Sequence, residues 1–189
     1  MEAKKDGYWF MEKKEYTVDD IMALPEGVRA ELFDGEMVML ATPTVTHQLL
    51  LNWFNVEIAI YIRNKGGNCL VLPAPFGVFI RKDNRNYYEP DVSVICDRDK
   101  LDEKGCHGGP DWVIEILSPS SRKYDCGKKL STYIDVGVRE YWIADPEKCV
   151  VVVYRLEKTD IPEVYPFGET IKAGIFEDLE LTVPKERLY

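Results

Sequence analysis

Residues 111–144 read DWVIEILSPSSRKYDCGKKLSTYIDVGVREYWIA. After Asp111, residues 112–117 are strand formers interrupted by one carboxylate, Glu115, and residues 140–144 are a second run rich in aromatic and β-branched residues. Between them, Ser121 can cap a helix that runs to about Val136 and stops at Gly137. The apolar side of that helix is expected to consist of Cys126, Leu130, Tyr133 and Ile134. This pattern predicts a strand, helix, strand unit with a crossover between parallel strands.

The sequence upstream of residue 111 predicts two helices, a hairpin and further strands. Thr17 caps a short helix that Pro25 stops, and Asp34-Gly35 is a strong signal for a hairpin between residues 30–33 and 36–40. A long amphipathic helix is expected from about Thr44 to Asn64, before Gly66-Gly67. Three core strands then follow: 69–72 with 77–80, kinked at 73–75; 87–96; and 111–117.

Beyond residue 144, strands are expected at 150–154, 164–167, 171–173 and 179–183. The whole pattern predicts an α/β (α+β) fold, in which a central mixed sheet is flanked by helices. The core order is helix, strand, strand, strand, helix, strand, with an N-terminal hairpin and extra C-terminal strands. The 189 residues suit a single domain over 1–189.

Composition narrows the class of protein. No apolar run reaches the ~18 residues of a membrane span, and the first residues lack a secretory signal, so we expect no membrane partner and a cytoplasmic location. The five cysteines form no C-x-x-C pair, which favours reduced thiols. The net charge of −9 opposes charge-driven binding of nucleic acid, although local groups of Lys and Arg leave room for a basic patch.

Two carboxylates stand within apolar runs: Asp91 in YEPDVSVI (88–95) and Glu115 in WVIEIL (112–117). Burying an unpaired carboxylate is expensive unless a cation compensates it. A divalent metal shared by the two is therefore favoured over two unrelated structural acids.

The order of elements, with Pro-Asp on one core strand and Glu on the next, resembles the PD-(D/E)XK nuclease superfamily. Within it, the chain is similar to the bacterial Uma-type family, called "putative restriction endonucleases". The segments that carry this resemblance are YEPDV (88–92), EILSPS (115–120), DCGKKL (125–130), Tyr133 and GVREYWIADP (137–146).

The resemblance implies a DNA endonuclease that depends on Mg²⁺ (or Mn²⁺). Asp91, Glu115 and the carbonyl of Ile116 would bind the metal, which suits hard oxygen ligands. A nearby lysine would position or deprotonate the attacking water and offset charge in the transition state. The superfamily pattern places that lysine two residues after the Glu, where this chain has Leu117.

In the Uma-type family the matching lysine lies on the following helix, which points to Lys129, with Lys128 as second choice. Asp125 and Lys129 could equally form an ordinary surface pair four residues apart. Glu31, in the hairpin, is either an extra acid near the metal or a solvent-facing strand residue. His47, on the apolar stripe of the long helix, is more simply a half-buried structural histidine than a catalytic one.

Two other functions stay open from the sequence. Leu117 and the acidic net charge favour a catalytically degenerate nuclease-fold module that binds DNA or a protein partner. A small-molecule hydrolase is less favoured, because no nucleotide or cofactor loop is present. A homodimer is a further expectation, since two active sites related by a two-fold axis match the two strands of a duplex.

Overall fold

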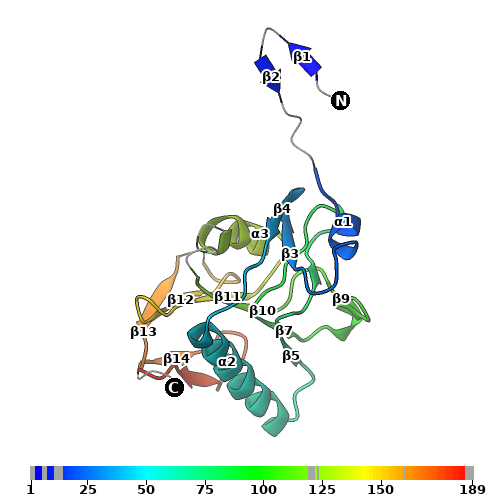
Figure 1. The fold of residues 1–189 in the computed structure, drawn as a ribbon. Coiled ribbons are helices and arrows are strands. Elements are labelled where there is room, and N and C mark those ends of the chain that lie inside the picture. The colour runs from blue at the N-terminus through cyan, green and yellow to red at the C-terminus, as the bar shows by residue number, and fades with distance from the viewer. Residues whose placement is uncertain are drawn as a thin grey trace.

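The fold is that of a computed structural model, which describes residues 3–5, 8–10, 15–118, 122, 124–159 and 161–185. Its central sheet has six strands in the order β13–β12–β11–β10–β7–β5 (Figure 1). Only β10 and β11 are parallel neighbours, so the sheet is mixed, as predicted. The strands span Leu70–Pro73 (β5), Val92–Ile95 (β7), Trp112–Ile116 (β10), Glu140–Asp145 (β11), Val150–Tyr154 (β12) and Glu163–Pro166 (β13).

Helices cover both faces of this sheet. The long helix α2 (Val45–Asn64) begins after its N-cap Thr44 and packs on one face. The other face is covered by a π-helical segment, η2 (Tyr124–Lys129), which continues into the short helix α3 (Leu130–Asp135). The order α2, β5, β7, β10, α3, β11 matches the predicted core.

Alternation along the strands produces two hydrophobic layers. Trp112 and Ile114 of β10 face α2, whereas Val113 faces Tyr133 of α3. Trp112 and Trp142 meet edge to face, with ring centroids 4.8 Å apart. Glu115 has the parity of Val113, so its side chain enters the layer beneath α3.

The N-terminal elements also follow the sequence. Helix α1 (Val18–Met22) starts at Thr17, whose backbone N–H and hydroxyl both donate to Asp20. The hairpin β3 (Ala30–Phe33) and β4 (Glu36–Met39) turns at Asp34 and Gly35, with φ of +48° and +82°. Two further ribbons are β1 (Ala3–Lys5) with β2 (Tyr8–Phe10), whose strands were not predicted, and β14 (Thr170–Lys172) with β15 (Glu180–Thr182), whose strands were predicted but not their pairing.

Two predicted strands are shorter than expected. Residues 77–80 leave the central sheet: β6 (Val78–Phe79) joins a separate three-stranded sheet with β8 (Leu101–Asp102) and β9 (Gly105–His107). A short 3₁₀ turn, η1 (Arg98–Lys100), precedes β8. Pro75 lacks the N–H that a ladder requires, which explains the break. Likewise Pro90 separates β7 from Tyr87 and Tyr88, which make single bridges to Leu32 and Val78.

The predicted helix over residues 121–136 is altered in register. Ser121, the expected cap, lies outside the described residues. Residues 124–129 form a π-helix, so the inward face differs from the one that an α-helical period predicts. Cys126 and Ile134, expected on the apolar side, are exposed, whereas Asp125 and Lys129 are buried.

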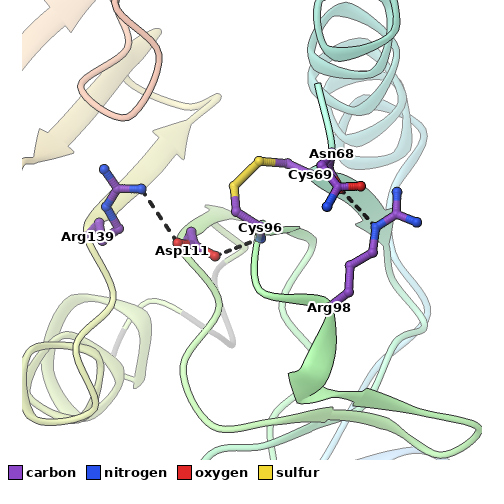
Figure 2. The surroundings of a disulfide bond; sticks show 6 residues. All are labelled: Asn68, Cys69, Cys96, Arg98, Asp111 and Arg139. Atoms are coloured by element: carbon purple, nitrogen blue, oxygen red, sulfur yellow. Dashed lines mark hydrogen bonds and ion pairs between the residues drawn. A yellow bond between two sulfur atoms is a disulfide. The ribbon is translucent and has the colours of Figure 1, made fainter. Parts of the chain in front are cut away.

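The expectation of five reduced thiols is wrong for two of them. Cys69 and Cys96 form a disulfide between the start of β5 and the end of β7 (Figure 2). Leu70 lies opposite Ile95 in the β5–β7 ladder, so the next pair in register brings the two cysteines together. Asp111 accepts the Cys96 N–H at 2.7 Å beside the disulfide. Cys106 is a buried free thiol, and Cys126 and Cys149 are exposed free thiols.

Across the described parts of the chain, no helix combines the length and the apolar character needed to cross a lipid bilayer.

Candidate functional site

The ammonium group of Lys129 lies among three carboxylates beneath α3. Its Nζ is 2.8 Å from Glu115 Oε1, 3.0 Å from Glu31 Oε1 and 3.2 Å from Asp125 Oδ1. All four residues are buried, and at most 4% of any of them is exposed. We call Glu31, Glu115, Asp125 and Lys129 the acid–lysine cluster.

Three separate elements bring the cluster together. Glu115 comes from the interior of β10, Glu31 from the neighbouring hairpin strand β3, and Asp125 and Lys129 from η2. The Glu31 carboxylate is fixed by the Glu89 backbone N–H, which donates to Oε1 at 2.9 Å. Buried apolar residues on either side of Glu31 (Ala30 and Leu32) and of Glu115 (Ile114 and Ile116) anchor the two strands in the core, which is why charges can be held at this depth.

Aromatic side chains line the cluster. The Tyr133 hydroxyl donates to Glu115 Oε1 at 3.2 Å, the same oxygen that Lys129 contacts. The ring of Tyr88 lies 5.9 Å from the Lys129 ammonium, within range of a cation–π interaction. Both described contacts of the Glu115 carboxylate fall on Oε1, and therefore its second oxygen can serve another ligand.

Asp91 lies next to this cluster, one residue before β7. Val92 pairs with Ile114, so the same register places Asp91 beside Glu115 at the end of the ladder. Asp91 Oδ2 accepts the Ile116 backbone N–H at 2.7 Å and lies 3.2 Å from His47 Nε2 in the first turn of α2. The two strand acids and Ile116 thus occupy one region, with His47 at its edge.

The structure distinguishes the two candidate lysines. Lys128 points away from the cluster, forms an ion pair with Glu36 at 2.7 Å and lies over the rings of Phe33 and Tyr124. The interpretation of Asp125 and Lys129 as a surface pair is wrong, because both are buried. Leu117, which takes the position of the usual lysine, packs in the hydrophobic layer with Tyr133.

Burial and charge shift the titration of the cluster. Burial raises the pKa of Glu115 well above its ordinary value, and it also raises the pKa of Glu31. The positive charge of Lys129 opposes both shifts. The negative charge of Asp125 adds to both of them. The charge of Asp91 also raises the pKa of Glu115, which agrees with its proximity.

Burial alone would lower the pKa of Lys129, but the charges of Glu115, Glu31 and Asp125 outweigh it and raise that pKa well above 10.5. The three carboxylates therefore favour the charged form of Lys129.

His47 is affected in the same manner. Burial lowers its pKa, but the hydrogen bond and charge of Asp91 outweigh burial, so the net shift is upward. His47 is therefore half-buried, as expected, but its partner is a candidate site residue.

Sequence reasoning missed three residues of this region: His47, Asp125 and Tyr133. The sequence places His47 and Tyr133 on apolar helix faces, and it leaves Asp125 open between a surface pair with Lys129 and a position near the site. One signal was available, because Asp125, Lys129 and Tyr133 are spaced four residues apart and so lie along one side of a helical segment.

A hollow of about 490 Å³ is lined by residues of the β3–β4 hairpin and of the η2–α3 segment, together with Arg81 and Tyr88. Its rim carries two cations whose ion pairs are solvent-exposed: Arg81 with Asp135 and Lys128 with Glu36, each at 2.7 Å. The remaining lining residues are Phe33, Asp34, Tyr88, Gly127, Ser131 and Thr132.

The donor set fits a hard divalent cation in its chemistry. Within the described residues, no group of three or more His, Cys, Asp or Glu side chains is arranged to hold a metal ion. Mg²⁺ is commonly held by one or two carboxylates, with water and phosphate oxygens completing its shell. Asp91 and Glu115 supply two carboxylates, and the three buried carboxyl groups of the acid–lysine cluster share a single ammonium.

The family model of Uma2, described as "putative restriction endonuclease", matches residues 18–184. The chain belongs to this family. The match covers every residue placed in the region of the acid–lysine cluster.

Two known proteins resemble this Uma2 chain. An uncharacterized protein of Synechocystis sp., slr1290, is 30% identical over 105 residues, which are 54% of this chain and 53% of that protein. The chain thus spans about half the length of this curated relative. The crystal structure of a putative nuclease of the DUF820 group from Anabaena variabilis aligns with a TM-score of 0.72 at 23% identity, over 88% of this chain and 94% of that one. The second likeness shows a shared fold.

Proposed function

We propose that this Uma2 protein hydrolyses phosphodiester bonds of DNA as a Mg²⁺-dependent endonuclease. The observation that carries the proposal is the acid–lysine cluster beside Asp91. A buried excess of carboxylates is costly for folding and is typical of a site that binds a cation. Membership of the family supports the reaction class.

In this proposal, Asp91, Glu115 and the Ile116 carbonyl would hold the metal, with Mn²⁺ as a substitute for Mg²⁺. When bound, the ion lowers the pKa of the attacking water and neutralises charge on the phosphate. The contacts of Lys129 and Tyr133 fix Glu115 through Oε1. The Ile116 N–H fixes Asp91 through Oδ2.

Lys129 acts as an electrostatic group. Because the carboxylates favour its charged form, its ammonium offsets the negative charge that develops on the phosphoryl oxygens. Glu31 keeps the ammonium in place from the hairpin side, since its own carboxylate is held by the Glu89 N–H. The position of Lys129 replaces the lysine that the superfamily pattern places at residue 117.

The test is the nicking of supercoiled plasmid in Mg²⁺ or Mn²⁺. Asp91→Asn and Glu115→Gln keep side-chain shape and should abolish cleavage, and Lys129→Met should lower the rate by about a hundredfold. Asp99→Asn, at an exposed acid of η1, is the matched control and should cut like the wild type. If the three site variants cut as well as the control, the assignment is wrong.

The net charge of −9 favours a second candidate function, a nuclease-fold module without catalysis. Calorimetric titration with Mn²⁺ separates the two. If the protein is an endonuclease, it should bind Mn²⁺, and Glu115→Gln should weaken that binding. A module without catalysis needs no Mn²⁺ binding.

A further inference from the structure

We propose that Asp125 is a positioning residue that holds the Lys129 ammonium against Glu115. This inference rests on the proposed phosphodiesterase function and adds a residue to it. Asp125 acts through Lys129 and needs no contact with metal or DNA.

The Asp125 side chain is directed at the ammonium. The residue is 1% exposed, and Oδ1 lies 3.2 Å from Lys129 Nζ. In the described structure this oxygen is buried and makes no hydrogen bond, so the contact is an electrostatic one. A carboxylate buried in this manner is costly unless its charge has a use.

The backbone around Asp125 is held by a different contact. Its carbonyl accepts the buried Tyr141 hydroxyl at 3.0 Å, which ties η2 to β11. This contact holds the backbone of the segment without the carboxylate. Its charge also adds a third negative charge to a cluster with one ammonium, which is unfavourable for folding.

The position of the Lys129 ammonium is best fixed by a contact from its own segment of the chain. A lysine ammonium ends a flexible four-carbon stem, so contacts must select its position. Glu115 is proposed to share its carboxylate with a metal, and Glu31 belongs to the separate hairpin. Asp125 belongs to the same π-helical segment and keeps the ammonium in the site whatever ligand Glu115 takes.

The first measurement is independent of activity. Lysine side chains labelled with ¹⁵N would report the Lys129 ammonium, whose signal is identified by its loss in Lys129→Met. A buried, ion-paired ammonium exchanges its protons slowly with water. Asp125→Asn should accelerate that exchange and shift the signal, whereas Asp99→Asn, at an exposed acid of η1, should leave both unchanged. An unaltered Lys129 signal in Asp125→Asn would overturn the proposal.

The second measurement uses kinetics. Asp125→Asn should lower kcat by roughly ten- to a hundredfold with KM and Mn²⁺ affinity unchanged, the scale expected of a supporting residue. In a Lys129→Met background the same change should have no further effect on kcat, because Asp125 acts through Lys129. Additive losses, or a fall in melting temperature that parallels the loss of kcat, would show a structural role and contradict the proposal.

The two proposals fail in different ways. If the wild type cuts no DNA in either metal, the proposed function is wrong, and the lysine spectra still decide whether Asp125 positions the ammonium. If the wild type cuts and Asp125→Asn is fully active, only the positioning role is wrong.

Discussion

At the scale of single residues, the ammonium of Lys129 is the counter-charge of three buried carboxylates. Lys129→Met keeps the length of the side chain but leaves these acids without their partner. Removing one member of a buried ion pair typically costs several kcal/mol. We expect the free energy of unfolding, measured in urea at neutral pH, to fall by about 3 kcal/mol.

The control for this prediction is the adjacent lysine. Lys128→Met removes an exposed pair with Glu36, whose energetic contribution is small. Equal unfolding midpoints for the two variants would contradict the central position of Lys129.

The residues that sequence reasoning missed are ones whose pattern fits two environments. A pair four residues apart has the same spacing whether it lies at the surface or in the core, and therefore Asp125 could not be placed from the sequence. Asp91 and Glu115 were singled out because a charge inside an apolar run has few structural explanations. His47 lay on an apolar stripe, and the sequence did not reveal that Asp91 faces it.

At the scale of elements, the disulfide joins the two strands that lead to the site. Cys69 and Cys96 are 27 residues apart in sequence and close a loop that contains β5, β6 and β7. Cross-links of this span restrict the unfolded chain and stabilise the fold. The double variant Cys69→Ser/Cys96→Ser should therefore lose about 3 kcal/mol of unfolding free energy.

Thiol counting under denaturing conditions checks the same bond. Three free thiols are expected without reductant, from Cys106, Cys126 and Cys149, and five after reduction. Cys149→Ser, an exposed free thiol, is the control and should not change stability. Five thiols before reduction would show that the disulfide is absent.

Asp145, at the turn after β11, leads to a prediction about how the stability of the fold depends on pH. Asp145 Oδ1 accepts the N–H groups of Glu147 and Lys148, both at 3.1 Å, and Oδ2 pairs with Arg122 at 2.9 Å. Burial would raise the pKa of Asp145, but Arg122 and these N–H groups outweigh burial and hold it below the ordinary 3.8.

Because the folded state holds this pKa down, the carboxylate stabilises the fold above pH 3.8 and loses that effect as pH falls through the lowered value. Asp145→Asn keeps the Oδ1 contacts and removes the charge. The free energy of unfolding of this variant should be about 1 kcal/mol lower than that of the wild type at neutral pH. It should also fall less steeply as the solution is made acidic. If the unfolding free energy of Asp145→Asn falls in acid as steeply as that of the wild type, this account is wrong.

Strand and helix positions were predicted well where hydrophobic periodicity is strong, as in α2, β10, β11 and β12. The structure departs from the predicted elements in two places, for local reasons that hydrophobic periodicity does not reveal. Pro75 and Pro90 interrupt ladders, and the π-helical turn of η2 changes which side chains face the core. The disulfide was missed because an odd number of cysteines does not specify which of them pair.

At the scale of the whole molecule, a net charge of −9 repels DNA, so binding must depend on local cations. Arg81 and Lys128 line the 490 Å³ hollow, which adjoins the proposed site. Lys128 directly precedes Lys129 in the chain. Tyr88 also lines the hollow, and its ring lies near the Lys129 ammonium. Their ion pairs with Asp135 and Glu36 are exposed and cost little to exchange for phosphate contacts.

If this rim contacts the DNA backbone, each of Arg81→Gln and Lys128→Gln should weaken DNA binding. Each should also reduce the slope of log affinity against log salt by about one unit, because one fewer counterion is released. The measurement is fluorescence anisotropy with labelled duplex over a range of KCl, in a Glu115→Gln background that prevents cleavage. Lys172→Gln, an exposed change on β14, which packs on the other face of the central sheet, is the control and should leave the slope unchanged. Equal slopes for all three variants would show that DNA follows a different path, since a phosphate contact cannot be removed without changing the number of ions released.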